Sequence, residues 1–146
     1  MNKITFILPF SNIGKDDVSE VGGKGANLGE MLRAGFPVPN GFVITVPAYD
    51  LFLKDNKLED KIYPLLSSIS VDNPLDLERV ATDIQKKIVS SPIPPEVVGA
   101  ITNSYKKLSG RFFSALVAVR SSATAEDLPK ASFAGQQATY LNVKGD

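Results

Sequence analysis

Short apolar runs alternate with helix-spaced apolar positions along this chain. The runs are rich in β-branched and aromatic residues, which predicts strands at residues 4–8, 42–46, 115–119 and 138–143. Apolar residues three and four apart predict helices at residues 26–34, 75–89 and 95–108, and shorter helices are expected at residues 47–54 and 58–66. The alternation predicts an α/β or α+β fold, with a mixed sheet and a helical middle segment. We expect residues 1–146 to be a single partial domain, a fragment of a longer protein.

Three of the predicted helices have an apolar face that we expect to be buried. Residues 11–20 are expected to form a polar loop before the first of them, and Gly35 is expected to end it. Prolines are expected to open the helices at residues 47–54, 75–89 and 95–108, where a missing N–H costs nothing. The three expected faces are Leu28, Met31 and Leu32; Leu77, Val80, Ala81, Ile84 and Ile88; and Val97, Ile101, Tyr105 and Leu108.

Composition narrows the class of protein. Of the 146 residues, 43% are hydrophobic and 22% are charged, as in globular proteins. The net charge of +0 argues against a nucleic-acid-binding surface. No apolar run approaches the roughly 20 residues of a membrane helix, so we expect a cytoplasmic protein without a membrane partner. The sequence does not predict an oligomeric state.

The chain contains neither cysteine nor histidine. It therefore supplies no thiolate and no imidazole base, phosphohistidine or histidine metal ligand. Chemistry that needs one of these groups has to obtain it from elsewhere.

A glycine-rich turn precedes the first predicted helix. Gly22, Gly23 and Gly25 allow the backbone to approach a ligand closely, and Lys24 adds a positive charge. The segment is not a phosphate-binding P-loop, because position 18 is valine and the residue after the lysine is not a hydroxyl residue. The alternative is a tight turn with a solvated lysine.

A second candidate begins at Arg120, which we expect at the end of a buried strand. The small and hydroxyl residues Ser121, Ser122 and Thr124 follow it, and such a run predicts a loop. A guanidinium group at the base of a loop rich in N–H groups suits a polyphosphate. The alternative is a structural salt bridge from Arg120 to one of the carboxylates at positions 126 and 127.

Gly135, Gln136 and Thr139 form a third candidate, a second phosphate-facing turn. A β-bulge at the start of the last strand is the alternative. The carboxylates of Glu126 and Asp127 are the pair that could hold Mg²⁺. A solvated loop, or an ion pair with the lysine at position 130, is the alternative for them.

Four segments carry a resemblance to a known family. Residues 21–30, VGGKGANLGE, and 38–42, VPNGF, resemble the start of the phosphoenolpyruvate synthase and pyruvate phosphate dikinase family. Residues 119–129, VRSSATAEDLP, and 131–137, ASFAGQQ, resemble its synthase branch closely. Rifampicin phosphotransferases share much of this pattern, and the resemblance extends over essentially the whole chain.

The resemblance implies the N-terminal part of an ATP-grasp nucleotide-binding domain. It implies that Lys24 and Arg120 contact ATP phosphates and that Gly135 and Thr139 lie in a lid over the nucleotide. Gly22, Gly23, Ser121, Ser122 and Gln136 are further candidates for ATP contact. The resemblance places no catalytic residue and no metal ligand in this chain.

The family reaction converts ATP, pyruvate and water to phosphoenolpyruvate, AMP and phosphate through a phosphohistidine on another domain. The resemblance implies ATP and Mg²⁺ as cofactors, with the metal ligands and the pyruvate site outside these residues. We expect the fragment alone to be inactive. Two alternatives stay open: the ATP-binding part of a rifampicin-type phosphotransferase, and a non-catalytic nucleotide-sensing module.

Overall fold

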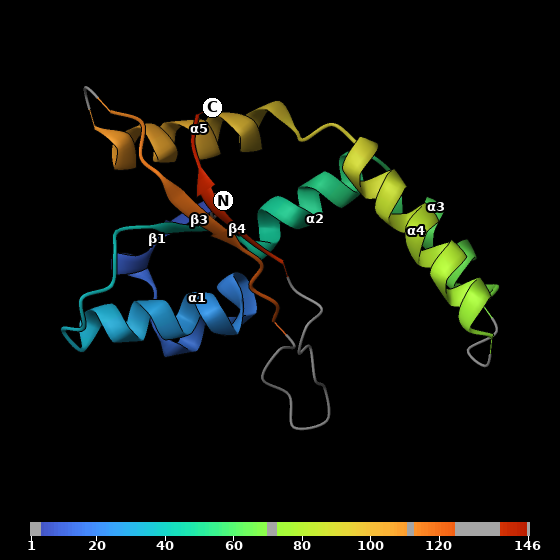
Figure 1. Cartoon of the computed structure of the whole chain (residues 1–146), viewed down its shortest axis with the longest axis horizontal. Helices are drawn as coiled ribbons and strands as arrows, with labels where there is room; N and C mark the ends of the chain where they lie inside the picture. The colour runs from blue at the N-terminus through green and yellow to red at the C-terminus, as the bar shows by residue number, and fades with distance from the viewer. Residues whose placement is uncertain (1–3, 70–72, 111–112, 125–137, 146) are drawn as a thin grey trace. The chain divides into compact units, whose positions relative to one another are not determined.

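The computed structural model describes residues 4–69, 73–110, 113–124 and 138–145 (Figure 1). Contacts divide the chain into two compact units. Met1–Ala48 and Glu96–Asp146 form the first, here called the strand unit, and Tyr49–Pro95 form the second, the helical unit. The single partial domain expected from the sequence stays a prediction.

Two antiparallel strand pairs lie in the strand unit. Strand β1 (Ile7–Pro9) pairs with β2 (Phe42–Ile44), and β3 (Val117–Arg120) pairs with β4 (Thr139–Val143). Helices combined with small sheets confirm the predicted α+β class. The mixed sheet is not seen, because both strand pairs of the described part are antiparallel.

The pairing of β3 with β4 is irregular. Val119 pairs with Tyr140 but Val117 pairs with Val143, so β4 has one extra residue between the two pairs. Asn142 in this interval has a positive φ of 58°, which asparagine tolerates better than most residues. The irregularity is a bulge inside β4. The β-bulge considered from the sequence as an alternative for Gly135 and Gln136 lies outside the described part of the chain.

Helix α1 (Val18–Arg33) begins earlier than predicted. Two single 3-10 turns, η1 (Phe10–Asn12) and η2 (Lys15–Asp17), precede it, so the loop expected over residues 11–20 is wrong. The sequence did not predict that α1 begins at Val18, because the glycines at 22, 23 and 25 have a low helix propensity and indicate a turn. The predicted end is confirmed: Gly35 N donates to Leu32 O and Phe36 N donates to Met31 O, as in a Schellman motif.

The buried face of α1 consists mostly of small residues. The apolar face predicted from spacing is wrong at Met31, which is 44% exposed. A side chain added at Gly29 would lie 2.5 Å from Ile13 O, so the helix backbone lies directly against the segment that contains Ile13. The buried residues of the helix are Val21, Gly22, Gly23, Gly25, Ala26 and Gly29.

Helix α2 (Val46–Asp55) leads from the strand unit into the helical unit, where α3 (Leu58–Ser67) packs against α4 (Pro74–Ser90). Leu58 and Val80 are fully buried in this unit. The Asn73 side chain caps α4 by accepting a hydrogen bond from Leu75 N, with Pro74 at the first helical position as predicted. The predicted bounds of these helices hold to within one or two residues.

Helix α5 (Pro95–Ser109) buries Val97 and Tyr105, two residues of its predicted face. The Tyr105 hydroxyl donates to Ala115 O over 2.7 Å and accepts from Gly145 N over 3.0 Å. One phenol therefore holds the chain segment before β3 and the segment after β4, and it fixes the open end of this strand pair.

Candidate functional site

The glycine turn lies in direct contact with residues 120–123, here called the end of β3 because they comprise its last residue and the three that follow. The two segments are far apart in sequence. The Ser122 hydroxyl donates to Val21 O over 2.7 Å and accepts from Gly25 N over 3.0 Å, linking residues 101 and 97 positions apart. Gly23 N donates to Ala123 O over 3.1 Å. These three hydrogen bonds join two segments that the sequence marked separately. A shared cleft for the Lys24 and Arg120 side chains stays a prediction.

Ser122 occupies a place inside the hydrogen-bond ladder of α1. In a regular α-helix the N–H of residue 25 would donate to the carbonyl of residue 21. Here the Ser122 hydroxyl takes both positions, and insertion of a side chain into the ladder is a known cause of a kink. The helix is bent at Gly22, whose φ of 73° and ψ of 169° are not helical.

Gly22 fits this contact because it has no side chain. A Cβ there would lie 2.5 Å from both the carbonyl and the hydroxyl oxygen of Ser122. Its backbone angles lie in a region that is essentially restricted to glycine. The sequence predicted a close approach at Gly22, but to a ligand rather than to another part of the chain. The hydroxyl residues after β3 were the only signal of an internal partner.

The two candidate cations flank this contact. Lys24 is partly buried and lies between Gly23 and Gly25, both of which bond to the end of β3. Arg120 is the last residue of β3 and pairs in register with Thr139 of β4. The glycine turn, the end of β3 and the start of β4 therefore lie side by side and carry Lys24, Arg120 and Thr139.

Arg120 differs from expectation in its exposure. It was predicted to end a buried strand, but β3 is partly buried at Val117 and exposed at its other residues. Its guanidinium group therefore needs no buried counter-ion. Ser121, the next residue, is exposed as well, whereas Ser122 is partly buried by the contacts described above. An exposed arginine beside an exposed hydroxyl is accessible to an anionic ligand.

Several predicted residues lie outside the described part of the chain. They are Gly135, Gln136, Glu126 and Asp127, so the lid contacts and the salt-bridge alternative for Arg120 stay predictions. Within the described ranges, no group of three or more acidic side chains could hold a metal ion. The carboxylates at positions 126 and 127 that were weighed for Mg²⁺ are outside the described residues, so the expectation about magnesium stays a prediction.

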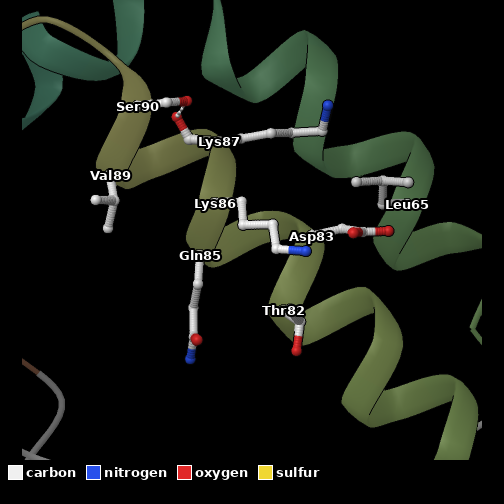
Figure 2. Close-up of a pocket in the computed structure, with 8 residues that line it drawn as sticks. All are labelled: Leu65, Thr82, Asp83, Gln85, Lys86, Lys87, Val89 and Ser90. Carbon is white, nitrogen blue, oxygen red and sulfur yellow. Dashed lines mark hydrogen bonds between the residues drawn. The ribbon is translucent and has the colours of Figure 1, made fainter.

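A separate groove of about 800 Å³ lies in the helical unit (Figure 2). Lys87 and Asp83 reach from α4 towards α3, where Leu65 lies. None of the residues predicted to contact ATP lines this groove. Its lining residues are Leu65, Thr82, Asp83, Gln85, Lys86, Lys87, Val89 and Ser90.

Residues 18–146 match the family described as "Pyruvate phosphate dikinase, AMP/ATP-binding domain". The match includes the glycine turn and both strands of the β3–β4 pair. The chain therefore belongs to this family of nucleotide-binding domains.

Three relatives make the assignment more specific. The chain is 52% identical to the "Probable phosphoenolpyruvate synthase" of Staphylothermus marinus over 97% of its own length, and 46% identical to that of Methanothermobacter thermautotrophicus, also over 97%. It is 44% identical to the "Phosphoenolpyruvate synthase" of Escherichia coli over 95% of its length. It spans between 17% and 21% of these three relatives. In the part of the chain that the structure describes, no helix has the length and apolar character that crossing a membrane requires.

Proposed function

We propose that this chain is part of the ATP-binding domain of a phosphoenolpyruvate synthase located in the cytoplasm. The names of the relatives support the synthase activity, and the family description supports ATP as the nucleotide. The observation that carries the proposal is the contact between the glycine turn and the end of β3, since it brings the segments of Lys24 and Arg120 together.

In the proposed reaction ATP, pyruvate and water give phosphoenolpyruvate, AMP and phosphate through a phosphohistidine. The chain contains no histidine, so the phosphohistidine belongs to another domain. The role of this chain is to hold the ATP phosphates for transfer. An ATP-grasp architecture belongs to the proposal, as do Mg²⁺ ligands outside the described residues.

The two cations have different parts in this grip. Arg120 offers a planar fork that binds two phosphate oxygens at once, and Lys24 offers a compact charge. Phosphoryl transfer depends on positioning and charge neutralisation more than on covalent chemistry by the protein. The hydroxyls of Thr139, paired with Arg120, and of exposed Ser121 add neutral donors. Gly135 and Gln136 are proposed to close over the nucleotide.

Gly22 and Gly23 have a conformational role in this proposal. Gly22 accommodates the kink, and the N–H of Gly23 is already donated to Ala123 O. Their contribution to ATP binding is therefore the shape of the turn.

The test uses the protein as its gene encodes it and measures AMP formation from ATP in the presence of pyruvate. Arg120→Ala and Lys24→Ala are each expected to lower kcat/KM by about 100-fold, the size of effect found when one charge-stabilising donor is removed. The matched control is Arg79→Ala, which removes an exposed arginine that pairs with Asp76 at 3.5 Å in the helical unit. The control should stay within about twofold of the parent protein.

Unchanged kinetics in Arg120→Ala and Lys24→Ala would show that these two side chains do not bind the ATP phosphates. AMP formation that depends on rifampicin rather than pyruvate would identify a drug phosphotransferase instead. Nucleotide binding without any AMP formation would indicate a non-catalytic nucleotide-sensing module.

A further inference from the structure

The Ser122 hydroxyl completes the backbone hydrogen bonding of helix α1, although Ser122 itself follows β3. Its proton is donated to Val21 O, and one of its lone pairs accepts Gly25 N–H. Val21 is 2% exposed and Gly25 is buried, so the two backbone groups depend on partners within the protein. A hydroxyl suits this place because it is donor and acceptor at once.

The inserted hydroxyl lies beside the backbone that carries Lys24. Lys24 precedes Gly25, which bonds to Ser122, and follows Gly23, which bonds to Ala123. Without the hydroxyl, Gly25 N–H and Val21 C=O would be free to bond directly and straighten the helix at Gly22. Straightening would rotate the backbone that carries Lys24 relative to the end of β3, where Arg120 lies.

We infer that Ser122 is a positioning residue for ATP binding that acts through Lys24 and does not itself bind phosphate. The inference rests on the proposed function, and it revises the expectation that Ser122 contacts ATP. Because its only proton is committed to Val21 O, the hydroxyl has no proton to donate to a phosphate oxygen. Its contribution is to keep the kink and thereby the distance between the two cations.

The test is a double-mutant cycle on the dissociation constant of MgATP, measured by titration calorimetry on the protein as its gene encodes it. Lys24→Ala is expected to weaken binding by about 10- to 100-fold, as the loss of a charged hydrogen bond predicts. Ser122→Ala is expected to weaken binding by about 5- to 10-fold in the parent protein, but by less than about twofold in the Lys24→Ala background. A residue that acts only through Lys24 has nothing to position once Lys24 is gone.

Two further variants separate positioning from general destabilisation. Ser122→Thr keeps a hydroxyl and is expected to restore affinity to within about threefold of the parent. Ser91→Ala removes a hydroxyl that donates to Lys87 O over the same 2.7 Å in the helical unit, and it should leave ATP affinity unchanged. If Ser122→Ala does not fold, Ser122→Cys takes its place in the cycle, because a thiol fills the site but bonds weakly.

The possible outcomes keep the two proposals apart. Equal weakening by the Ser122 substitution with and without Lys24 would overturn the positioning role and leave the phosphate grip intact. Unchanged affinity in the Ser122 variant, with a loss in Lys24→Ala, would do the same. Unchanged affinity in Lys24→Ala itself would overturn the proposed grip.

Discussion

Helices α1 and α4 are both amphipathic, but different kinds of residue bury them. In α4 the fully buried residue is Val80, a branched side chain of the face that the sequence predicted, although Leu77 of the same face is exposed. In α1 four glycines and an alanine are buried together with Val21, while Met31 of the predicted face is 44% exposed. Helix α4 packs through side chains, whereas α1 brings its backbone against other backbone.

The two kinds of packing constrain the position of a helix differently. Side-chain packing stabilises a helix by burying apolar side chains, as in the contact of α3 with α4. Backbone contacts such as Gly23 N to Ala123 O and the approach of Gly29 to Ile13 O fix a helix with little freedom. The strand unit uses the second kind of contact beside Lys24 and Arg120, the two residues proposed to bind the ATP phosphates.

The largest effect is expected at Gly22. Gly22→Ala adds a Cβ at 2.5 Å from two Ser122 oxygens and forces an unfavourable φ, so it should destabilise the strand unit by about 4 kcal/mol. Gly35→Ala is the matched control, since Gly35 has a φ of 82° but nothing within 4 Å of the added Cβ. The control should cost about 1 kcal/mol, as conformational strain alone predicts. Amide hydrogen exchange in α1 measures the loss of stability in both variants. Equal losses would show that the close contact between Gly22 and Ser122 does not determine the effect.

A smaller effect is expected in the core of the helical unit. Leu58 is fully buried, and Leu58→Ala should destabilise that unit by about 3 kcal/mol through the cavity it leaves. Leu75→Ala, at a leucine that is 77% exposed, should change stability by less than about 0.5 kcal/mol. Hydrogen exchange in α3 and α4 measures both. Protection that is unchanged in Leu58→Ala would show that side-chain packing does not hold this unit.

The smallest changes in stability are expected at two helical glycines, one in close contact with another segment and one with open space around it. Gly29→Ala places a Cβ 2.5 Å from Ile13 O and should cost about 2 kcal/mol, although alanine favours a helix. Gly99→Ala in α5 meets nothing within 4 Å and should instead stabilise by about 1 kcal/mol. Thermal unfolding of the two variants should shift in opposite directions. A stabilising Gly29→Ala would contradict backbone packing of α1.

The sequence predicted the bounds of the helices of the middle segment well, because apolar periodicity and prolines are local signals. The first strand was predicted at residues 4–8 but spans Ile7–Pro9, and Leu77 of the face predicted for α4 is exposed. The sequence also misjudged the start and the buried face of α1. Those are set by contact with Ile13 and Ser122, and no local preference encodes a partner that lies far along the chain. The two candidate segments were found from their composition, but the hydroxyl inserted at the Gly22 kink was not. A serine in a loop has the same local character whether its partner is solvent, a phosphate or a helix.

Lys24 and Arg120 are proposed to hold the phosphates of one ATP molecule. A crystal structure of the protein, as its gene encodes it, with a non-hydrolysable ATP analogue and Mg²⁺ tests this proposal most directly. We expect Lys24 Nζ and the Arg120 guanidinium nitrogens to lie within about 3 Å of phosphate oxygens of the same nucleotide. A nucleotide bound with its phosphates away from either side chain would show that Lys24 and Arg120 do not act together on ATP.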